Sequence, residues 1–152
     1  MGIGKLEVKL EFSEFPRKYT CDGEDVSPKI EISGIGDAKS IAIVVDDPDA
    51  PIGTFTHWLI WNIEPVEVIP ENIPKKGEIT DPLVAVQGRN DFGNVGYNGP
   101  CPPPGKPHRY FFKVYALDTK LDIPPGSGKS EVERAIEGHV LQYGETVATY
   151  GR

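Results

Sequence analysis

The sequence predicts a mainly β fold, built as a sandwich-like core with one flanking helix near the end of the chain. About seven short segments carry the alternating or continuous apolar patterns of strands, and only one segment has helical spacing. The 17 glycines and 15 prolines are spread along the chain, which implies many turns. A length of 152 residues suits one domain, and we expect that domain to span residues 1–152.

The first strand is expected over residues 5–12. The letters KLEVKLEF alternate charged and apolar residues, which is typical of a strand with one face in water. Residues 15–28 are polar and rich in turn formers, so they are expected to form a loop. A short strand over residues 30–32 follows.

The centre of the chain is expected to supply the buried strands. Residues 40–45, SIAIVV, form a continuous β-branched run, which predicts a strand buried on both faces. Further strands are expected over residues 57–63, 83–87 and 108–117. The stretch around Pro65, Pro70 and Pro74 and the Gly/Pro/Asn-rich residues 88–107 are expected to be loops. Loops as long as the second one are usually functional or disordered.

One helix is expected after residue 130. Ser130 and Glu133 fit a capping box, with Ser130 as N-cap. Gly144 is placed to cap the C-terminus, and residues 145–150 then form the last strand. The apolar positions at helical spacing are Val132, Ala135, Ile136, Val140 and Leu141.

Charge and hydropathy exclude several function classes. The formal net charge is −7, which has the wrong sign for a general binder of nucleic acid or of a membrane surface. No apolar run approaches the ~20 residues that cross a bilayer. The first ten residues carry no apolar signal segment. We therefore expect a cytoplasmic protein without a membrane span and without a nucleic-acid partner.

The two cysteines, Cys21 and Cys101, are too few for a disulfide scaffold and form no CxxC motif. They are either two buried thiols or one long-range disulfide. Cytosolic disulfides are rare outside hyperthermophiles. The single methionine and the many prolines favour a thermophilic source and hence the disulfide.

Five residues are candidates for a shared site. Asp47 and Asp49 flank a proline directly after the buried strand, so the carboxylates have few available directions. His57 begins the next apolar strand. His108 and Tyr110 lie two residues apart in a strand and therefore point to one face, which leaves Arg109 free for an ion pair on the other. An Asx-Pro turn would also explain the aspartates, and a core histidine would explain His57.

Other chemistries fit these residues less well. Two histidines and two carboxylates could bind Zn²⁺, but no closely spaced ligand pair such as HxH or HExxH occurs. No GxSxG motif supplies a nucleophilic serine, and Cys101 lies between two prolines. We expect no metal and no cofactor. A hydrolase that uses Asp49 and His108 for acid–base chemistry remains an alternative.

Several motifs together resemble the phosphatidylethanolamine-binding protein (Raf kinase inhibitor protein) family, in its bacterial and archaeal branch. They are DPDAP at residues 47–51, the strand that His57 begins, GPCPP at residues 99–103 and GKPHRY at residues 105–110. The resemblance implies a large antiparallel sheet packed on a smaller sheet, with one or two peripheral helices. It also implies an anion pocket whose residues here are Asp47, Asp49, Pro51, His57, Gly99, Pro100, His108 and Tyr110.

The resemblance further implies a non-enzymatic binding or regulatory protein. Its ligand would be a small anion such as phosphate, or a phospholipid head group. Backbone N–H groups, the Tyr110 hydroxyl and imidazole N–H groups would supply donors, and nearby carboxylates would favour imidazolium. A proteinase inhibitor that acts through protein–protein contact is the alternative. A homodimer is also expected by resemblance, because relatives form dimers.

Overall fold

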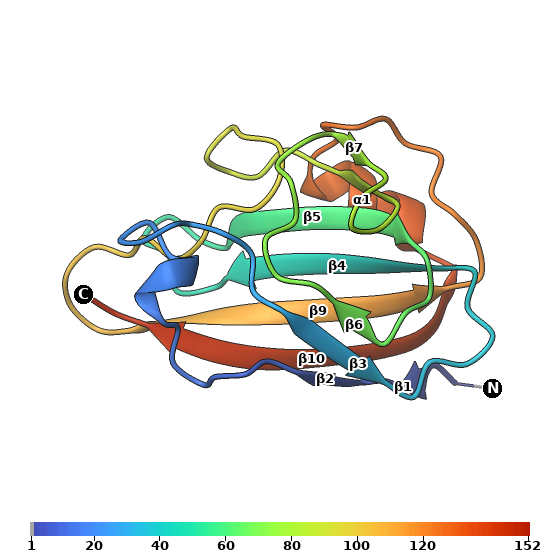
Figure 1. The fold of residues 1–152 in the computed structure, drawn as a ribbon, viewed down its shortest axis with the longest axis horizontal. Coiled ribbons are helices and arrows are strands. Elements are labelled where there is room, and N and C mark those ends of the chain that lie inside the picture. Colours follow the sequence, from blue (N-terminus) through green and yellow to red (C-terminus); the bar gives the residue numbers. More distant parts are fainter. Residues whose placement is uncertain (1) are drawn as a thin grey trace.

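The structure, a computed structural model, describes residues 2–152. Two β-sheets pack face to face, and one helix, α1 (Lys129–Ile136), covers part of the outer face of the larger sheet (Figure 1). The mainly β class and the packing of a large sheet on a small one are both confirmed. No helix among residues 2–152 is long and apolar enough to cross a membrane.

The larger sheet has seven strands. Every neighbouring pair is antiparallel except β1 and β10, which run parallel. In order across the sheet the strands are β1 (Gly4–Lys5), β10 (Val140–Tyr150), β9 (His108–Leu117), β4 (Ser40–Asp47), β5 (Phe55–Ile63), β8 (Ala85–Gln87) and β7 (Glu78–Ile79).

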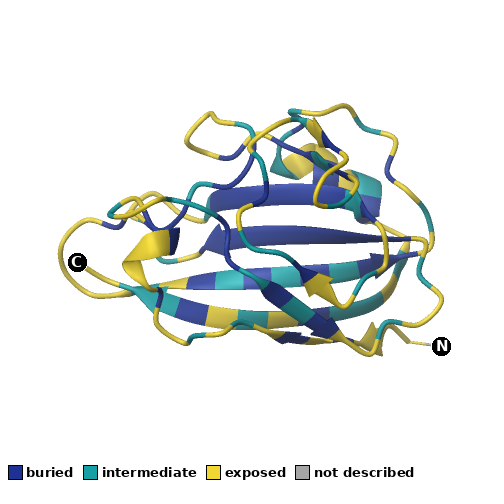
Figure 2. Ribbon diagram, in the orientation of Figure 1, coloured by how far each residue is buried: buried dark blue, intermediate teal, exposed yellow. Residues whose placement is uncertain are grey.

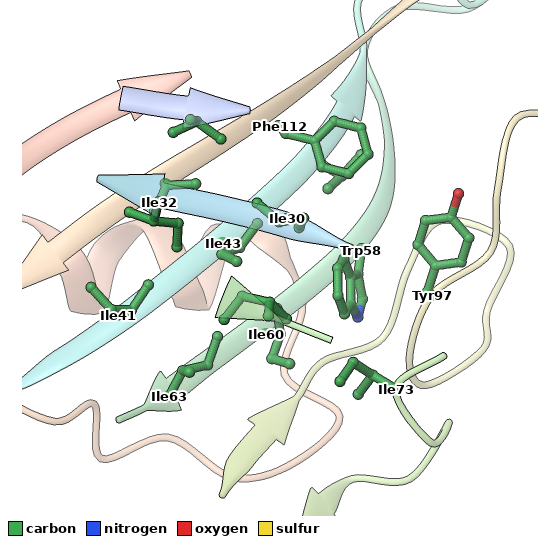
Figure 3. Packing of buried hydrophobic residues seen from close by; sticks show 14 of the residues in the cluster. Ile30, Ile32, Ile41, Ile43, Trp58, Ile60, Ile63, Ile73, Tyr97 and Phe112 are labelled. Carbon is green, nitrogen blue, oxygen red and sulfur yellow. The ribbon is translucent and has the colours of Figure 1, made fainter. Parts of the chain in front are cut away.

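The smaller sheet lies across one face of the larger one and encloses the main core. It consists of the antiparallel strands β2 (Glu7–Lys9), β3 (Ile30–Ser33) and β6 (Val68–Ile69). Isoleucines from both sheets and Trp58 interlock in this core, with Tyr97 and Ile73 at its side (Figure 3). Burial of these side chains supplies about 25 cal/mol for each Å² of apolar surface removed from water.

Strand β4 is buried along its whole length, as its continuous apolar run predicts (Figure 2). Ile41, Ile43 and Val45 enter the main core. Ala42 and Val44 point to the opposite face, where they pack in a second cluster that includes Val132 and Ile136 of α1. A strand clamped from both faces is a rigid support for the residues at its end.

The predicted single strand over residues 5–12 is wrong. The alternation of exposed and buried residues is as expected, with Leu6 and Val8 buried. The backbone, however, pairs first with β10 as β1 and then with β3 as β2. Leu6 lies at the switch between sheets, and its N–H donates to the Tyr143 carbonyl at 2.9 Å. An alternating pattern of charged and apolar residues identifies the solvent-exposed face of a strand, but it does not identify the sheet with which the strand pairs.

The helix is shorter than predicted and begins earlier. Its N-cap is Gly128, and Glu131 occupies the third helical position, where Oε2 accepts from the Gly128 N–H at 3.2 Å. The helix ends at Ile136, because Gly138 adopts a left-handed φ of +83° and residues from Val140 onward pair with β9. The capping role expected for Gly144 is therefore wrong.

Gly144 instead lets the N-terminal segment pass close to β10. A Cβ atom at this position would lie 2.3 Å from the Leu6 carbonyl oxygen. Such a contact is far inside van der Waals distance, so only glycine fits where the two backbones cross. A glycine near the end of a predicted helix can either cap the helix or allow a close contact between two backbones. Gly144 allows the close contact.

The loops gather at one end of the large sheet. Strands β4 and β10 end there and β5 and β9 begin there, on the left of Figure 1. The boundaries differ slightly from expectation: β4 runs on to Asp47 and β5 begins at Phe55. The proline-rich stretch expected to be loop also contains β6. Residues 88–107 form a long connection, as expected, that reaches the same end.

Candidate functional site

A small pocket of about 140 Å³ opens at this end of the sheet. It takes residues from the β4–β5 connection, from the starts of β5 and β9, and from the long loop of residues 88–107. Five of the eight expected site residues line it: Asp47, Pro51, His57, His108 and Tyr110. The remaining lining residues are Ala50, Phe55, Phe92, Cys101, Pro102 and Pro103.

Asp47 and His108 form a buried pair in the pocket. The two residues come from the adjacent strands β4 and β9, and His108 Nδ1 lies 2.7 Å from Asp47 Oδ2. Their side chains are 4% and 12% exposed. Asp47 Oδ1 accepts a second hydrogen bond, from the Asp49 N–H at 2.7 Å. A carboxylate can only accept, so Nδ1 of His108 carries a proton and Nε2 is the ring nitrogen left for a ligand.

His57 is held by a backbone carbonyl. Its Nδ1 lies 2.7 Å from the Asn98 carbonyl oxygen, which fixes the proton on Nδ1. The side chain is almost completely buried, and burial lowers its pKa below the usual 6.5 despite the nearby carboxylates of Asp47 and Asp25. The carboxylates favour the imidazolium form, as expected, but desolvation of the charged ring outweighs their attraction.

Tyr110 supplies a phenol to the same pocket. The residue is 1% exposed, and its ring packs edge-on against His57 at 5.3 Å between centroids. Burial raises the pKa of its hydroxyl far above 10, so the group stays protonated. The hydroxyl makes no hydrogen bond within residues 2–152, but it is not cut off from the cavity, because Trp61 Nε1 is the one fully buried side-chain N or O atom there without a partner. His108 and Tyr110 line one face, as their spacing predicts.

Asp49 does not line this pocket. Its carboxylate receives the side chain of Arg109 at 2.9 and 3.0 Å and the Arg109 backbone N–H at 2.9 Å. These hydrogen bonds lower the pKa of Asp49 to about 2. Because its own N–H binds Asp47, Asp49 links the two strand ends that carry Asp47 and His108. Asp49 therefore supports Asp47 and His108, which line the pocket, and forms the ion pair that was expected for Arg109.

Gly99 and Pro100 also lie outside the pocket lining. The Gly99 N–H donates to Asp25 Oδ1 at 2.7 Å, and the Pro100 carbonyl accepts from the Cys21 N–H at 3.1 Å. A Cβ atom on Gly99 would lie 1.9 Å from the Tyr19 carbonyl oxygen. Both residues therefore fasten the long loop to the loop near residue 20, and the Gly99 N–H and the Pro100 carbonyl are already hydrogen-bonded.

The structure joins Cys21 and Cys101 in a disulfide, with Cα atoms 5.4 Å apart. No free cysteine remains among the described residues. Cys101 lines the pocket, and Pro102 and Pro103 follow it directly. Arg152 adds a second attachment, donating to the Pro102 carbonyl at 2.9 Å and to Asp22 at 3.0 Å. The pocket wall formed by Cys101, Pro102 and Pro103 is therefore attached to the rest of the protein both by the disulfide and by Arg152.

Two aromatic residues of the lining were not predicted. Phe55 and Phe92 pack edge-on at 4.7 Å, and both contact the His57 ring. Phe92 sits in the long loop, whose length indicated function but not which side chain turns inward. The alternation of β5 from Phe55 to His57 would have placed Phe55 beside His57 on one face.

The lining limits the chemistry available. Within residues 2–152, no three His, Cys, Asp or Glu side chains are grouped to hold a metal ion. The pocket lining contains no serine, no threonine and no free thiol. Of the two residues named for acid–base chemistry, His108 pairs with Asp47 and Asp49 is bound by Arg109. The pocket is a small cavity in which imidazole nitrogens and the Tyr110 hydroxyl lie among aromatic and proline side chains.

Comparisons with known proteins identify the family of the chain. The family model described as phosphatidylethanolamine-binding protein matches residues 8–151. The UPF0098 protein PH1269 of Pyrococcus horikoshii is 60% identical, over 100% of this chain and 81% of its own length.

Two solved structures share the fold along nearly the whole chain. A putative phosphatidylethanolamine-binding protein homologue from Chlamydia trachomatis superposes with a TM-score of 0.87 at 34% identity. YbcL of E. coli, described as a new member of the mammalian family, gives 0.87 at 32% identity. Each comparison covers 98% of this chain and 99% of the other. The chain therefore belongs to the phosphatidylethanolamine-binding protein family.

Proposed function

We propose that the protein is a non-enzymatic binding protein whose pocket takes a small oxyanion, as a free ion or as the terminal group of a larger ligand. One observation carries the proposal: three polar ring atoms without a partner among residues 2–152 meet in one cavity. They are two imidazole nitrogens, Nε2 of His57 and Nε2 of His108, and the hydroxyl oxygen on the Tyr110 ring. Trp61 Nε1 is the one fully buried side-chain N or O atom without a partner among the described residues, so these three atoms are open to the cavity and available to a ligand.

The size of the pocket favours a small group. A volume of about 140 Å³ is below the ~300–1,000 Å³ typical of sites that enclose a drug-sized molecule. An adjoining hollow of about 610 Å³ shares Pro103 and His108 with the pocket and is lined by Lys106 and Arg109. An anionic group in the pocket and its substituent in this hollow would together account for both cavities.

Local charge supports an anion although the whole chain carries −7. Lys106 and Arg109 line the adjoining hollow, where Arg109 is paired with Asp49, which lines it too, and Lys106 adds a further positive charge. Local potentials rather than net charge decide where an ion binds. The acidic surface elsewhere argues against an extended polyanion such as nucleic acid as the partner.

The two alternative functions, a hydrolase and a proteinase inhibitor, have less structural support. A hydrolase with water as nucleophile would have to use Asp47 and His108, since the pocket lining has no serine, no threonine and no free thiol. Proteinase inhibition stays a prediction from family resemblance, and loss of protease activity at stoichiometric protein would test it. Turnover of an ester panel that is lost in His108→Ala would establish the hydrolase instead.

A thermal-shift panel tests the proposal. Phosphate, acetate and phosphoethanolamine are added to wild type, to His108→Ala and to His139→Ala. His139 is a matched control, because it also pairs with an aspartate, Asp118 at 2.8 Å, but lies far from the pocket on an exposed surface. Binding raises the melting temperature by linkage. We expect stabilisation of wild type and of His139→Ala, and its loss in His108→Ala. Equal shifts in all three proteins, or none, would reject the pocket.

A further inference from the structure

The disulfide between Cys21 and Cys101 is unusually open to solvent. Cysteine is among the residue types most often buried, yet both residues of this pair are exposed. Cys101 lines the pocket of about 140 Å³ and also a second hollow of about 200 Å³, which Cys21 lines with it. A solute that enters either hollow therefore reaches Cys101. An exposed disulfide is open to attack by a small thiol, whereas a buried disulfide is protected.

A guanidinium lies against one of the two sulfur atoms. Arg152 Nη1 donates to Cys21 Sγ at 3.6 Å. The same side chain donates to the Asp22 carboxylate at 3.0 Å and to the Pro102 carbonyl at 2.9 Å, which fixes the cation beside the sulfur. The Asp22 carboxylate also accepts from the Tyr150 hydroxyl, so its charge is engaged within this cluster. A neighbouring guanidinium stabilises a thiolate. Cys21 is therefore the sulfur better able to leave as an anion.

The surroundings of Cys101 favour the opposite role. Each of the two hollows that Cys101 lines contains a carboxylate, Asp47 in one and Asp25 in the other. Carboxylates oppose the formation of a second negative charge nearby. Attack on Cys101 places the departing negative charge on Cys21, beside Arg152. Attack on Cys21 would instead leave that charge on Cys101. The two sulfur atoms are therefore not equivalent, and Cys101 is the one expected to form the new bond.

We propose that the Cys21–Cys101 disulfide is a reversible thiol-exchange site, at which a small monothiol becomes bonded to Cys101. The incoming thiolate sulfur forms a bond with Cys101 Sγ, the Sγ–Sγ bond breaks, and its electron pair leaves on Cys21 Sγ beside Arg152. The proton that the monothiol loses before the attack balances the proton that the Cys21 thiolate takes up to become a thiol. The new substituent occupies one of the two hollows that Cys101 lines.

Hydrogen bonds that do not involve the sulfur atoms also join the two loops that carry the cysteines. The Cys21 N–H donates to the Pro100 carbonyl at 3.1 Å, and the Tyr97 hydroxyl donates to the Tyr19 carbonyl at 2.7 Å. These contacts keep Cys21 close to Cys101 after the exchange. The Cys21 thiolate can then attack the mixed disulfide, expel the small thiol and close the original bond, which makes the modification reversible.

Mass spectrometry of the full chain tests the proposal. The oxidised protein is incubated with cysteamine at pH 8, free thiols are blocked with N-ethylmaleimide, and peptide mapping locates both groups. We expect cysteamine on Cys101 and maleimide on Cys21. When free cysteamine is removed before blocking, the mass of the oxidised protein should return. An adduct on Cys21, equal adducts on both cysteines, or no adduct under conditions that convert oxidised glutathione would overturn the proposal.

Variants of Arg152 separate stabilisation of the leaving thiolate from support of the loop. Arg152→Gln removes the cation beside Cys21 and should slow adduct formation several-fold, and Arg152→Lys should restore part of the rate. Loss of loop support alone would have the opposite effect, because a loosened disulfide is more accessible to the thiol. Arg134→Gln, on the exposed side of α1, is the control and should react like wild type. An equal or faster rate in Arg152→Gln would overturn the proposal.

Discussion

At the scale of single residues, the two aspartates of the DPDAP segment have different tasks. Asp47 ends β4 and faces the pocket, whereas Asp49 is turned to Arg109. The sequence supports the choice of this segment, since a proline between two aspartates at a strand end fixes their directions. The sequence does not show which aspartate faces the pocket, because this depends on where β9 begins. Arg109 of β9, the partner of Asp49, lies 60 residues further along the chain.

Asp49→Asn should weaken phosphate binding several-fold with little change in fold. An amide cannot replace the carboxylate in its paired bonds to Arg109, so His108 and Asp47 lose part of their support. Calorimetric affinity and melting temperature, measured side by side, check this. Asp118→Asn removes a carboxylate from an exposed His–Asp pair and serves as control. An unchanged affinity in Asp49→Asn would show that the link is not needed.

His57 should make the fold sensitive to moderate acid. Its pKa is lowered in the fold, so below the unfolded value of about 6.5 the unfolded chain binds a proton that the folded chain resists. The stabilising contribution is therefore complete above pH 6.5 and is lost as pH falls below it. Melting temperature between pH 7.5 and 4.5 should fall less steeply in His57→Gln than in wild type. His139→Gln should follow wild type, and parallel curves for all three would contradict the argument.

At the scale of elements, the buried strand and its neighbours follow directly from the sequence. Continuous β-branched residues in β4 and the apolar run of β5 need no partner information to be identified. The segment from Val132 to Gly144 does need it. Its helical spacing runs on through Val140 and Leu141, but pairing of Val140 and Tyr143 with β9 takes these residues into a strand. Tertiary pairing outweighs a local propensity of a few tenths of a kcal/mol.

Gly144→Ala should destabilise the protein, since the added Cβ would meet backbone of the N-terminal segment. The contact at 2.3 Å is with the Leu6 carbonyl, which cannot move without breaking the β1–β10 pairing. We expect a loss of about 1–3 kcal/mol in the free energy of unfolding, measured with urea. Gly2→Ala, which has no atom within 4 Å of its Cβ, is the control. Equal midpoints for the two variants would refute the close approach.

The disulfide joins two loops at the pocket, and its removal should affect stability and binding together. The bond closes a loop of 80 residues, for which about 4 kcal/mol of stabilisation is expected. The double variant Cys21→Ser with Cys101→Ser should unfold at lower urea and bind phosphate more weakly, because Pro102 and Pro103 lose an attachment. Reduction of wild type should give the same result. A midpoint and affinity identical to those of the oxidised protein would contradict both effects.

At the scale of the whole molecule, the site exists because antiparallel topology brings distant ends together. Asp47, His57 and His108 stand at an end or a beginning of three strands that neighbour each other as β9, β4 and β5. The sequence indicates that each candidate adjoins a loop, and family resemblance supplies their grouping. Which atoms are open to a ligand could not be predicted, because that depends on the Asn98 carbonyl and on the course of the long loop.

The central claim is that this strand-end pocket binds a small oxyanion, and Tyr110→Phe tests it most directly. The change removes one oxygen, keeps the buried ring and takes away the donor that has no protein partner. Phosphate is titrated calorimetrically into wild type and variant at the same pH. We expect one saturable site in wild type and about tenfold weaker binding in Tyr110→Phe, with similar melting temperatures for the two free proteins. No binding to wild type, or equal affinity in the two proteins, would contradict the claim.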